Sequence, residues 1–416
     1  MSRRKPPQHP PEPPLTGYSQ VAKTVLQEGA SRVEEMHRAI AAQSFDLVKG
    51  IPLAGAPARL VQQAHDAIAG GVYTAIRQGG GGLLDLAAFL EKPGTAPAAP
   101  AAGDTPPDPP SRLASGMRSA LNAAFGDHFA ETNNILALTM DLRLGGQPVA
   151  LHREALARAY PAAGDRVCVF IHGLWHDEHC WEASGGGVDM PRQVARDTGH
   201  APLTLRYNTG LPIVENGAQL AVLLAELLEA WPVPLHELVL IGHSMGGLVA
   251  RSACTQAAAA GLNWLERTRM VICLGSPHLG SPVERLGELA TTALGLSAIT
   301  APLGQIAAQR SQGIQDLRHG LGPPTQTANH IAWRFVGGSV ADDPDDPLGE
   351  IIGDGLVTLS SATAHELTGD VDSVRLGGVG HMELIKEARV YRRILAWLKA
   401  GPGLSRRAGR RGGGRG

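Results

Sequence analysis

Ser244 stands in the clearest chemical setting in the chain, the segment Gly242-His-Ser-Met-Gly246. An apolar run, Leu238–Ile241, precedes this segment, and a helical pattern begins at Gly247. A serine on a sharp turn between a strand and a helix projects its hydroxyl above the edge of a sheet. The N-terminus of the helix also favours negative charge that develops beside it. The pattern therefore predicts a nucleophile at Ser244, with a plain serine turn between glycines as the alternative.

A serine nucleophile needs a base and an acid that orients the base. In a strand–turn–helix setting of this kind, the acid and then the histidine follow the serine along the chain. Asp354 lies between two glycines after the predicted strand Ile331–Val336, and His381 lies in a glycine-rich loop before the final predicted helix. We expect both side chains over the carboxyl ends of parallel strands. An Asp-Gly turn is the alternative for Asp354. The competing candidates are Asp342, Asp343, Asp345 and Asp346 for the acid, and His330 and His365 for the base.

A second loop carries the pattern of an oxyanion hole. The apolar run Val167–Ile171 ends in His172-Gly173, two predicted strands before Ser244. A loop at this place presents a backbone N–H group to a substrate oxygen, and we assign Leu174 and Met245 as the two donors. We expect His172 to hold the loop. The residues expected in or beside the substrate pocket around these groups are His172, Gly173, Trp175, Trp181 and His243.

Metal-ligating residue types also gather in and after this loop. They are His172, His176, His179, Asp177 and Glu178. Metal ligands must converge in a fixed geometry, so we interpret this group as the polar rim of a pocket and expect no metal. We expect no organic cofactor either. The four cysteines are too few and too scattered for a disulfide framework or a zinc ribbon; they are Cys168, Cys180, Cys254 and Cys273.

Composition excludes several classes of protein. The chain has 416 residues and a formal net charge of −2, and this balance argues against a nucleic-acid-binding surface. The N-terminus lacks an apolar h-region, so no signal peptide is expected. No run approaches the roughly 18 apolar residues of a membrane span. We therefore expect a cytoplasmic protein, with peripheral membrane contact left open.

Proline and glycine content divides the chain into segments. Residues 1–14 are Pro-rich and residues 401–416 form a basic Gly/Arg tail, and both are expected to be disordered. Residues 92–111 form a Pro/Ala-rich linker, because their prolines exclude helix and strand. Residues 15–91 carry two amphipathic helical patterns, and residues 112–400 form the larger domain. We expect the N-terminal apolar stripes to pack on the larger domain or to form a homo-oligomer, rather than to lie on a membrane.

Strands and helices alternate from Arg166 onward, which predicts an α/β fold with a mostly parallel central sheet and helices on both faces. A hairpin around Gly145-Gly146, within Leu136–Leu151, fits an antiparallel edge. The predicted strands are Val167–Ile171, Pro202–Tyr207, Leu238–Ile241, Met270–Leu274, Ile331–Val336 and Ser373–Leu376. The predicted helices are Ser115–Phe129, Pro191–Asp197, Gly217–Ala230 and Gly247–Ala259.

From about Gln147 to Lys399 the chain resembles serine esterases and lipases of the α/β-hydrolase superfamily. It is similar in particular to the bacterial lipase-like branch that is grouped with GPI inositol-deacylase-like and serine esterase domains. The motifs that carry the resemblance are Phe170–Leu174, Arg206–Gly210, Ile241–Gly247, Leu274–Ser281 and Asp354–Val357. The resemblance implies an α/β-hydrolase fold with the triad Ser244, Asp354 and His381, and with Leu174 and Met245 as the oxyanion hole. It also implies that His278 helps to shape the pocket wall.

The segment 282–319 is rich in leucine and isoleucine and has few charges. In lipases such insertions cover an apolar substrate groove, so we expect a lid or cap here, with ordinary packing against the sheet as the alternative. The expected reaction is hydrolysis of a carboxylic ester, lipid-like or of medium chain length, through an acyl-enzyme on Ser244. The alternatives are an acyltransferase, an amide or thioester hydrolase, and a non-catalytic binding module.

Overall fold

The computed structural model describes residues 112–134, 136–183, 186–281, 311–321, 330–363 and 369–400. The predicted N-terminal helices, the linker, the basic tail and residues 282–310 of the candidate lid lie outside the described residues. The expectations for these segments, and the division of the chain into domains, stay predictions.

Within the described residues, eight strands form one sheet in the order β2-β1-β4-β3-β5-β6-β7-β8. Strands β3 to β8 pair in parallel, whereas β1 is antiparallel to both β2 and β4. This arrangement confirms the predicted mostly parallel sheet and its antiparallel hairpin at one edge. The strands are β1 (Asp141–Leu144), β2 (Gln147–Pro148), β3 (Arg166–Ile171), β4 (Ala201–Arg206), β5 (Glu237–His243), β6 (Thr268–Leu274), β7 (Ala332–Ser339) and β8 (Val371–Gly377).

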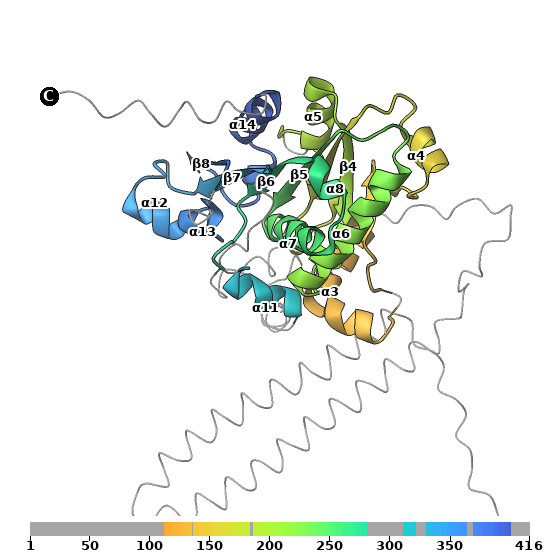
Figure 1. The fold of residues 1–416 in the computed structure, drawn as a ribbon. Helices are drawn as coiled ribbons and strands as arrows, with labels where there is room; N and C mark the ends of the chain where they lie inside the picture. Colours follow the sequence, from red (N-terminus) through yellow and green to blue (C-terminus); the bar gives the residue numbers. More distant parts are fainter. Residues whose placement is uncertain are drawn as a thin grey trace, which may run out of the picture. The chain divides into compact units, whose positions relative to one another are not determined.

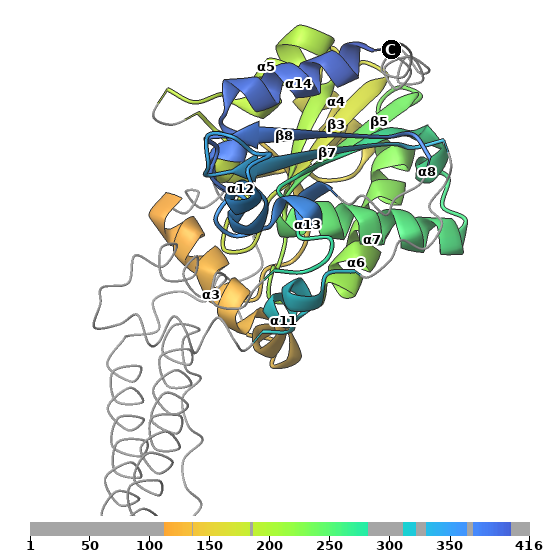
Figure 2. The same cartoon turned by 90° about the vertical axis from the view of Figure 1, so that its left-hand side faces the viewer.

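Helices cover both faces of the sheet, as predicted. Figures 1 and 2 show α5 and α14 together on one face, with α6 and α7 on the other. The helices are α3 (Arg112–Glu131), α4 (Arg153–Ala159), η1 (Glu178–Trp181), α5 (Met190–Thr198), α6 (Ile213–Ala230), α7 (Met245–Ala260), α8 (Trp264–Arg267), α11 (Gln312–His319), α12 (Pro347–Ile352), α13 (Leu359–Thr363), η2 (Glu383–Ile385) and α14 (Ala388–Lys399).

The central strands are apolar on both sides, because both sides are covered. All five residues of Val167–Ile171 are fully buried. Alternate residues of this run, Cys168 and Phe170, belong to the core layer that contains α5 and α14. A continuous apolar run is therefore the signature of a parallel strand inside a layered α/β domain.

Helix α11 forms the last part of the segment predicted as a lid. The backbone N–H of Gln312 donates to Asp127 Oδ2 at 3.0 Å, and Ser311 Oγ donates to the carbonyl of Ala123 at 2.6 Å. Both acceptors lie on α3. The end of the predicted lid is thus a helix packed on α3, and the lid itself stays a prediction.

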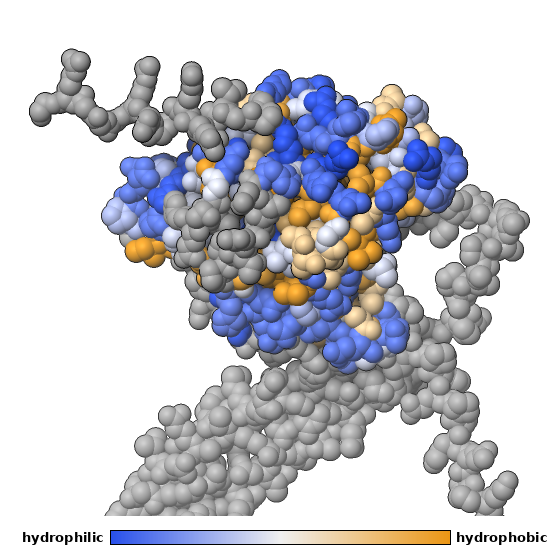
Figure 3. All heavy atoms as spheres, viewed as in Figure 1, coloured by the Kyte–Doolittle hydropathy of each residue, from blue (hydrophilic) through white to orange (hydrophobic). Residues whose placement is uncertain are grey.

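The surface in the view of Figure 3 is mostly hydrophilic, with apolar side chains gathered over α6 and α7. On α6, Val214 and Val222 are exposed. Among the described helices, none combines the length and the hydropathy that a membrane crossing requires.

We expect Phe170→Ala to lower the free energy of unfolding by about 3–5 kcal/mol, because the change leaves a cavity in the buried layer. The Phe170 ring is fully buried and meets the Trp181 ring edge-on, with centroids 5.3 Å apart. Denaturation in urea measures the change. The control is Val222→Ala, at a position 56% exposed, where the change is expected to stay within about 0.5 kcal/mol. Equal losses in the two variants would contradict the layered packing.

Candidate active site

Ser244 lies at the turn between β5 and α7, with φ 53° and ψ −123°. A non-glycine residue in such a region costs about 1–3 kcal/mol and persists only where its surroundings hold it. Two hydrogen bonds hold it here. Ser244 N donates to the Leu274 carbonyl at 2.8 Å, and Gly247 N donates to the Ser244 carbonyl at 3.1 Å. The strand–turn–helix setting predicted for this serine is present.

Close backbone approach explains two of the glycines around Ser244. A Cβ atom on Gly246 would lie 2.3 Å from the carbonyl oxygen of Ile171, at the end of β3. A Cβ atom on Gly173 would lie 2.9 Å from the Cβ of Ser244. Glycine at these positions therefore lets the loop after β3 lie directly against the candidate nucleophile.

Asp354 and His381 are joined through their backbones, where the His381 N–H donates to the Asp354 carbonyl at 2.9 Å, and through their side chains. His381 Nδ1 donates to Asp354 Oδ2 at 2.8 Å, and both side chains are buried. The other carboxylate oxygen of Asp354 accepts from the backbone N–H groups of Leu356, at 3.0 Å, and Val357, at 2.8 Å. These bonds orient the carboxylate, and the carboxylate in turn holds the imidazole with Nε2 away from the acid. The structure thus joins the acid and the base that the sequence predicted.

The rival candidates that the structure describes have other surroundings. His330 precedes β7, at the opposite end of that strand from Asp354, and its Nε2 donates to the Leu265 carbonyl at 3.0 Å. His365 lies outside the described residues. The four rival carboxylates are all exposed; they are Asp342, Asp343, Asp345 and Asp346.

His243 connects the nucleophile turn to the loop of the base. Its Nε2 donates to the backbone carbonyl of His381 at 3.0 Å, and the two rings lie 4.7 Å apart between centroids. Burial and the neighbouring His381 hold the pKa of His243 well below its usual range, so this ring is neutral. Within the described residues no hydrogen bond joins Ser244 Oγ to His381. Catalytic hydrogen bonds are often long without substrate and tighten in the complex.

The loop 172–177 after β3 carries the predicted oxyanion donor. Among the described residues, the backbone N–H groups of Leu174 and Met245 donate to no carbonyl in a turn or loop. His172 Nδ1 donates to the Gly173 carbonyl at 2.9 Å, and burial lowers the pKa of His172 to about 4. Tyr207 stacks on the His172 ring at 4.5 Å and donates to the His172 carbonyl at 2.8 Å. The ring contacts therefore hold the start of the loop.

The remaining predicted pocket residues have different surroundings. Trp175, in the loop 172–177, has φ 70°, and its buried indole N–H has no hydrogen-bond partner among the residues that the structure describes. Trp181 is fully buried against Phe170. His278 accepts on Nδ1 from Arg251 at 2.7 Å. Burial and that guanidinium hold its pKa well below the usual range. The contacts of His278 thus join it to α7.

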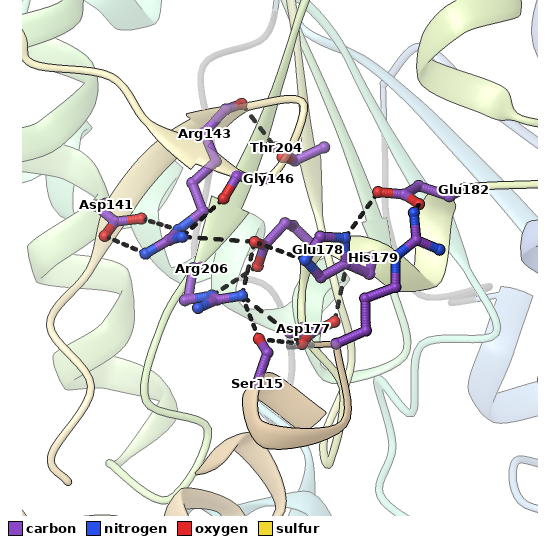
Figure 4. Close-up of polar contacts among 11 residues, drawn as sticks. Ser115, Asp141, Arg143, Gly146, Asp177, Glu178, His179, Glu182, Thr204 and Arg206 are labelled. Atoms are coloured by element: carbon purple, nitrogen blue, oxygen red, sulfur yellow. Dashed lines mark hydrogen bonds and ion pairs between the residues drawn. The ribbon is translucent and has the colours of Figure 1, made fainter. Parts of the chain in front are cut away.

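Figure 4 shows a buried network of charges beside this loop. Arg206, at the end of β4, donates to Glu178 through Nε and Nη2, both at 2.7 Å. Its Nη2 also donates to Ser115 Oγ on α3, and Ser115 donates to Asp177 Oδ2 at 2.7 Å. Arg143 approaches Glu178 at 3.7 Å. The network joins the edge hairpin, α3 and the end of the loop 172–177.

The same network accounts for the carboxylates that imitate a metal cluster. Burial acts to raise the pKa of Asp177, but the hydrogen bond from Ser115 and the nearby cations outweigh it, so the pKa lies below its usual range. Glu178 is bound by Arg206. In the part of the chain that the structure describes, no three His, Cys, Asp or Glu side chains are placed to hold a metal ion.

Sequence reasoning assigned no role to Ser115 and Arg206, although both lie beside the predicted site. Arg206 begins the Arg206–Gly210 motif, and a charged residue at the end of an apolar strand is a signal for a buried partner. The Asp177–Glu178 pair supplies that partner from the segment that follows β3, the strand next to β4 in the sheet. Ser115 carries no such signal, because its partners are 62 and 91 residues away.

Comparisons with known proteins place this geometry in context. Residues 223–295 match the model of a PGAP1-like alpha/beta domain. A comparison with curated proteins gives no match. Among solved structures, the chain is similar to the mature lipase BlEst2 of Bacillus licheniformis, with 21% identity, 62% of this chain and 98% of that chain covered, and a TM-score of 0.43. It is also similar to an esterase of Pyrobaculum calidifontis, with 17% identity, 57% and 78% covered, and a TM-score of 0.38.

Both TM-scores lie below 0.5, and the fold follows from the strand order and the serine turn of this chain. The parallel sheet with its antiparallel edge and the serine turn after β5 define the α/β-hydrolase fold. The match over residues 223–295 includes this turn. The protein is an α/β-hydrolase-fold protein that is similar to serine esterases and lipases.

We expect Arg206→Met to lower the free energy of unfolding by about 3–5 kcal/mol, because it removes both hydrogen bonds that Arg206 donates to the buried Glu178 carboxylate. Chemical denaturation followed by circular dichroism measures the loss. The control is Arg196→Met, which removes an ion pair with Asp197 from a side chain that is 68% exposed. That change is expected to cost less than about 1 kcal/mol. A similar small loss for Arg206→Met would show that the buried network is not required for stability.

Proposed function

We propose that this protein is a serine hydrolase that cleaves carboxylic esters through an acyl-enzyme on Ser244. The observation that carries the proposal is the hydrogen-bonded pair of Asp354 and His381 in the loops beside the strained turn of Ser244. A serine, a base and an orienting acid in this chain order are the parts that nucleophilic acyl transfer needs.

In the proposed mechanism, Ser244 Oγ attacks the ester carbonyl carbon while His381 Nε2 takes the hydroxyl proton. The carbonyl electrons move to oxygen, and the N–H groups of Leu174 and Met245 bind the resulting oxyanion. The C–O bond to the alcohol then breaks, and His381 gives its proton to the leaving oxygen. Water activated by His381 attacks the acyl-enzyme and releases the acid. Asp354 keeps the imidazole in the required tautomer throughout.

The proposed substrate is a lipid-like or medium-chain acyl ester. The apolar segment 282–319, which precedes β7, and the lipase-like motifs support this choice. The chemistry requires no metal or organic cofactor, because the triad supplies the proton transfers and the backbone supplies the oxyanion donors. Cleavage of a graded series of esters would identify the preferred acyl length.

We expect a fluorophosphonate probe to label Ser244 in the wild-type protein, as located by mass spectrometry of the adduct. Ser244→Ala removes the attacking oxygen, so labelling is lost and kcat for ester hydrolysis falls by about 10⁶-fold. The matched control is Ser252→Ala, which changes another buried serine on α7 and leaves labelling intact. Full labelling or hydrolysis by a folded Ser244→Ala variant would refute the mechanism. Absence of labelling in wild-type protein, repeated in detergent, would favour a binding module.

We expect Asp354→Asn to lower kcat by about 10⁴-fold, with a smaller effect on KM. The amide keeps the size of the side chain but no longer holds His381 in the tautomer that accepts a proton from serine. Steady-state hydrolysis of a soluble ester measures this change. Asp342→Asn, at an exposed position of the rival cluster, serves as the control and keeps wild-type activity. The opposite pattern would move the acid to the exposed cluster.

A further inference from the structure

Helix α3 contributes one side chain, Ser115, to the charges buried beside the loop 172–177 (Figure 4). This serine is 4% exposed. Its hydroxyl accepts from Arg206 Nη2 and donates to Asp177 Oδ2 at 2.7 Å. The guanidinium and the Asp177 carboxylate are themselves 3.7 Å apart. The Ser115 hydroxyl is therefore the hydrogen-bonded link between them.

Two consecutive residues hold the loop 172–177 from outside. Tyr207 Oη donates to the carbonyl of His172 at the start of the loop. Arg206 binds the end of the loop, through Ser115 to Asp177 and directly to the following glutamate. The loop is thus fixed at both ends by the last residue of β4 and the residue that follows it.

Between these two anchors the loop carries the candidate oxyanion donor. A Cβ on Gly173 would lie 2.9 Å from the Cβ of Ser244, so the backbone at Gly173 lies directly against the turn of the candidate nucleophile. The next residue, Leu174, supplies the N–H group. A small displacement of a donor of this kind is costly, because a shift of about 1 Å in a reacting group can lower the rate about 100-fold.

Asp177 is the point at which the Ser115 hydroxyl acts on the loop. Its Oδ1 accepts from the backbone N–H of His179 at 3.1 Å and so caps η1, while its Oδ2 accepts from Ser115. Without the hydroxyl, a buried carboxylate oxygen and an N–H of Arg206 each lose a partner. We therefore expect the end of the loop that carries Asp177 to move until the carboxylate finds another hydrogen-bond donor.

Resting on the proposed ester hydrolysis, we propose that Ser115 is a positioning residue that ties the loop 172–177 to α3 and thereby directs the Leu174 N–H at the oxyanion formed on Ser244. A helix that precedes the sheet in the chain is in this way part of the scaffold of the active site. In this proposal Ser115 has no role in binding the acyl chain.

The test compares the full-length wild-type chain with Ser115→Ala, using p-nitrophenyl butyrate as the ester. Active sites are counted by fluorophosphonate labelling, so that rates refer to folded enzyme. We expect kcat to fall about 10-fold with KM unchanged, because the displaced donor acts mainly in the transition state. The inhibition constant of an alkyl trifluoromethyl ketone, whose adduct with Ser244 bears the same oxyanion, is expected to rise by a similar factor.

Ser119→Ala is the matched control, since Ser119 is also buried and lies one turn further along α3. It is expected to keep the wild-type kcat and ketone affinity. If Ser115→Ala does not fold, Arg206→Lys is measured in its place. This variant keeps the charge and loses the paired hydrogen bonds to Glu178. The variant is expected to show the same joint loss of kcat and ketone affinity.

A folded variant with a lower Tm but with wild-type kcat and ketone affinity per active site would overturn the inference, because the hydroxyl would then be purely structural. This result differs from failure of the proposed function, in which the wild-type chain itself is neither labelled nor active. That second result would overturn both proposals.

Discussion

The strained turn at Ser244 is the constraint on which the rest of the site depends. Its backbone lies in a region that costs about 1–3 kcal/mol for a residue with a side chain, so its neighbours must hold it. The hydrogen bond to the Leu274 carbonyl ties the turn to β6, and the absence of a side chain at Gly246 lets α7 begin against the end of β3. Three adjacent strands therefore meet at one residue. The serine, the loop 172–177 and the sheet must be positioned together.

Buried carboxylates serve the site in two ways. Asp354 accepts from His381 on one carboxylate oxygen and from two backbone N–H groups on the other, so these bonds fix its orientation toward His381. Glu178 instead binds Arg206, and Asp177 accepts a hydrogen bond from Ser115. A buried ion pair is weak support for stability by itself, because desolvation offsets most of its attraction. Because the pair of Arg206 and Glu178 lies at the end of the loop 172–177, we infer that it fixes the position of that loop.

The sequence predicted the turn at Ser244 and the pair of Asp354 and His381, because each depends on short-range pattern. An apolar run, a glycine-rich turn and a chain order suffice to place a side chain at the carboxyl end of a strand. Strand ends were harder to predict: β7 runs to Ser339 rather than to Val336, because pairing with β8 continues through Gly337 and Gly338, residues that strands otherwise avoid. Such pairing is set by the neighbouring strand.

Local pattern alone was enough to place Ser244 on its turn and to predict a parallel sheet, because the periodicity of a strand or helix is visible within a few residues of sequence. Long-range packing was needed for the rest. Ser115 reaches Arg206 across 91 positions, and the Arg206–Glu178 pair is buried only because α3, β4 and η1 converge. A charged residue in a sequence is most often solvated. Whether it is buried, and what it binds there, depends on which distant segments remove the water around it.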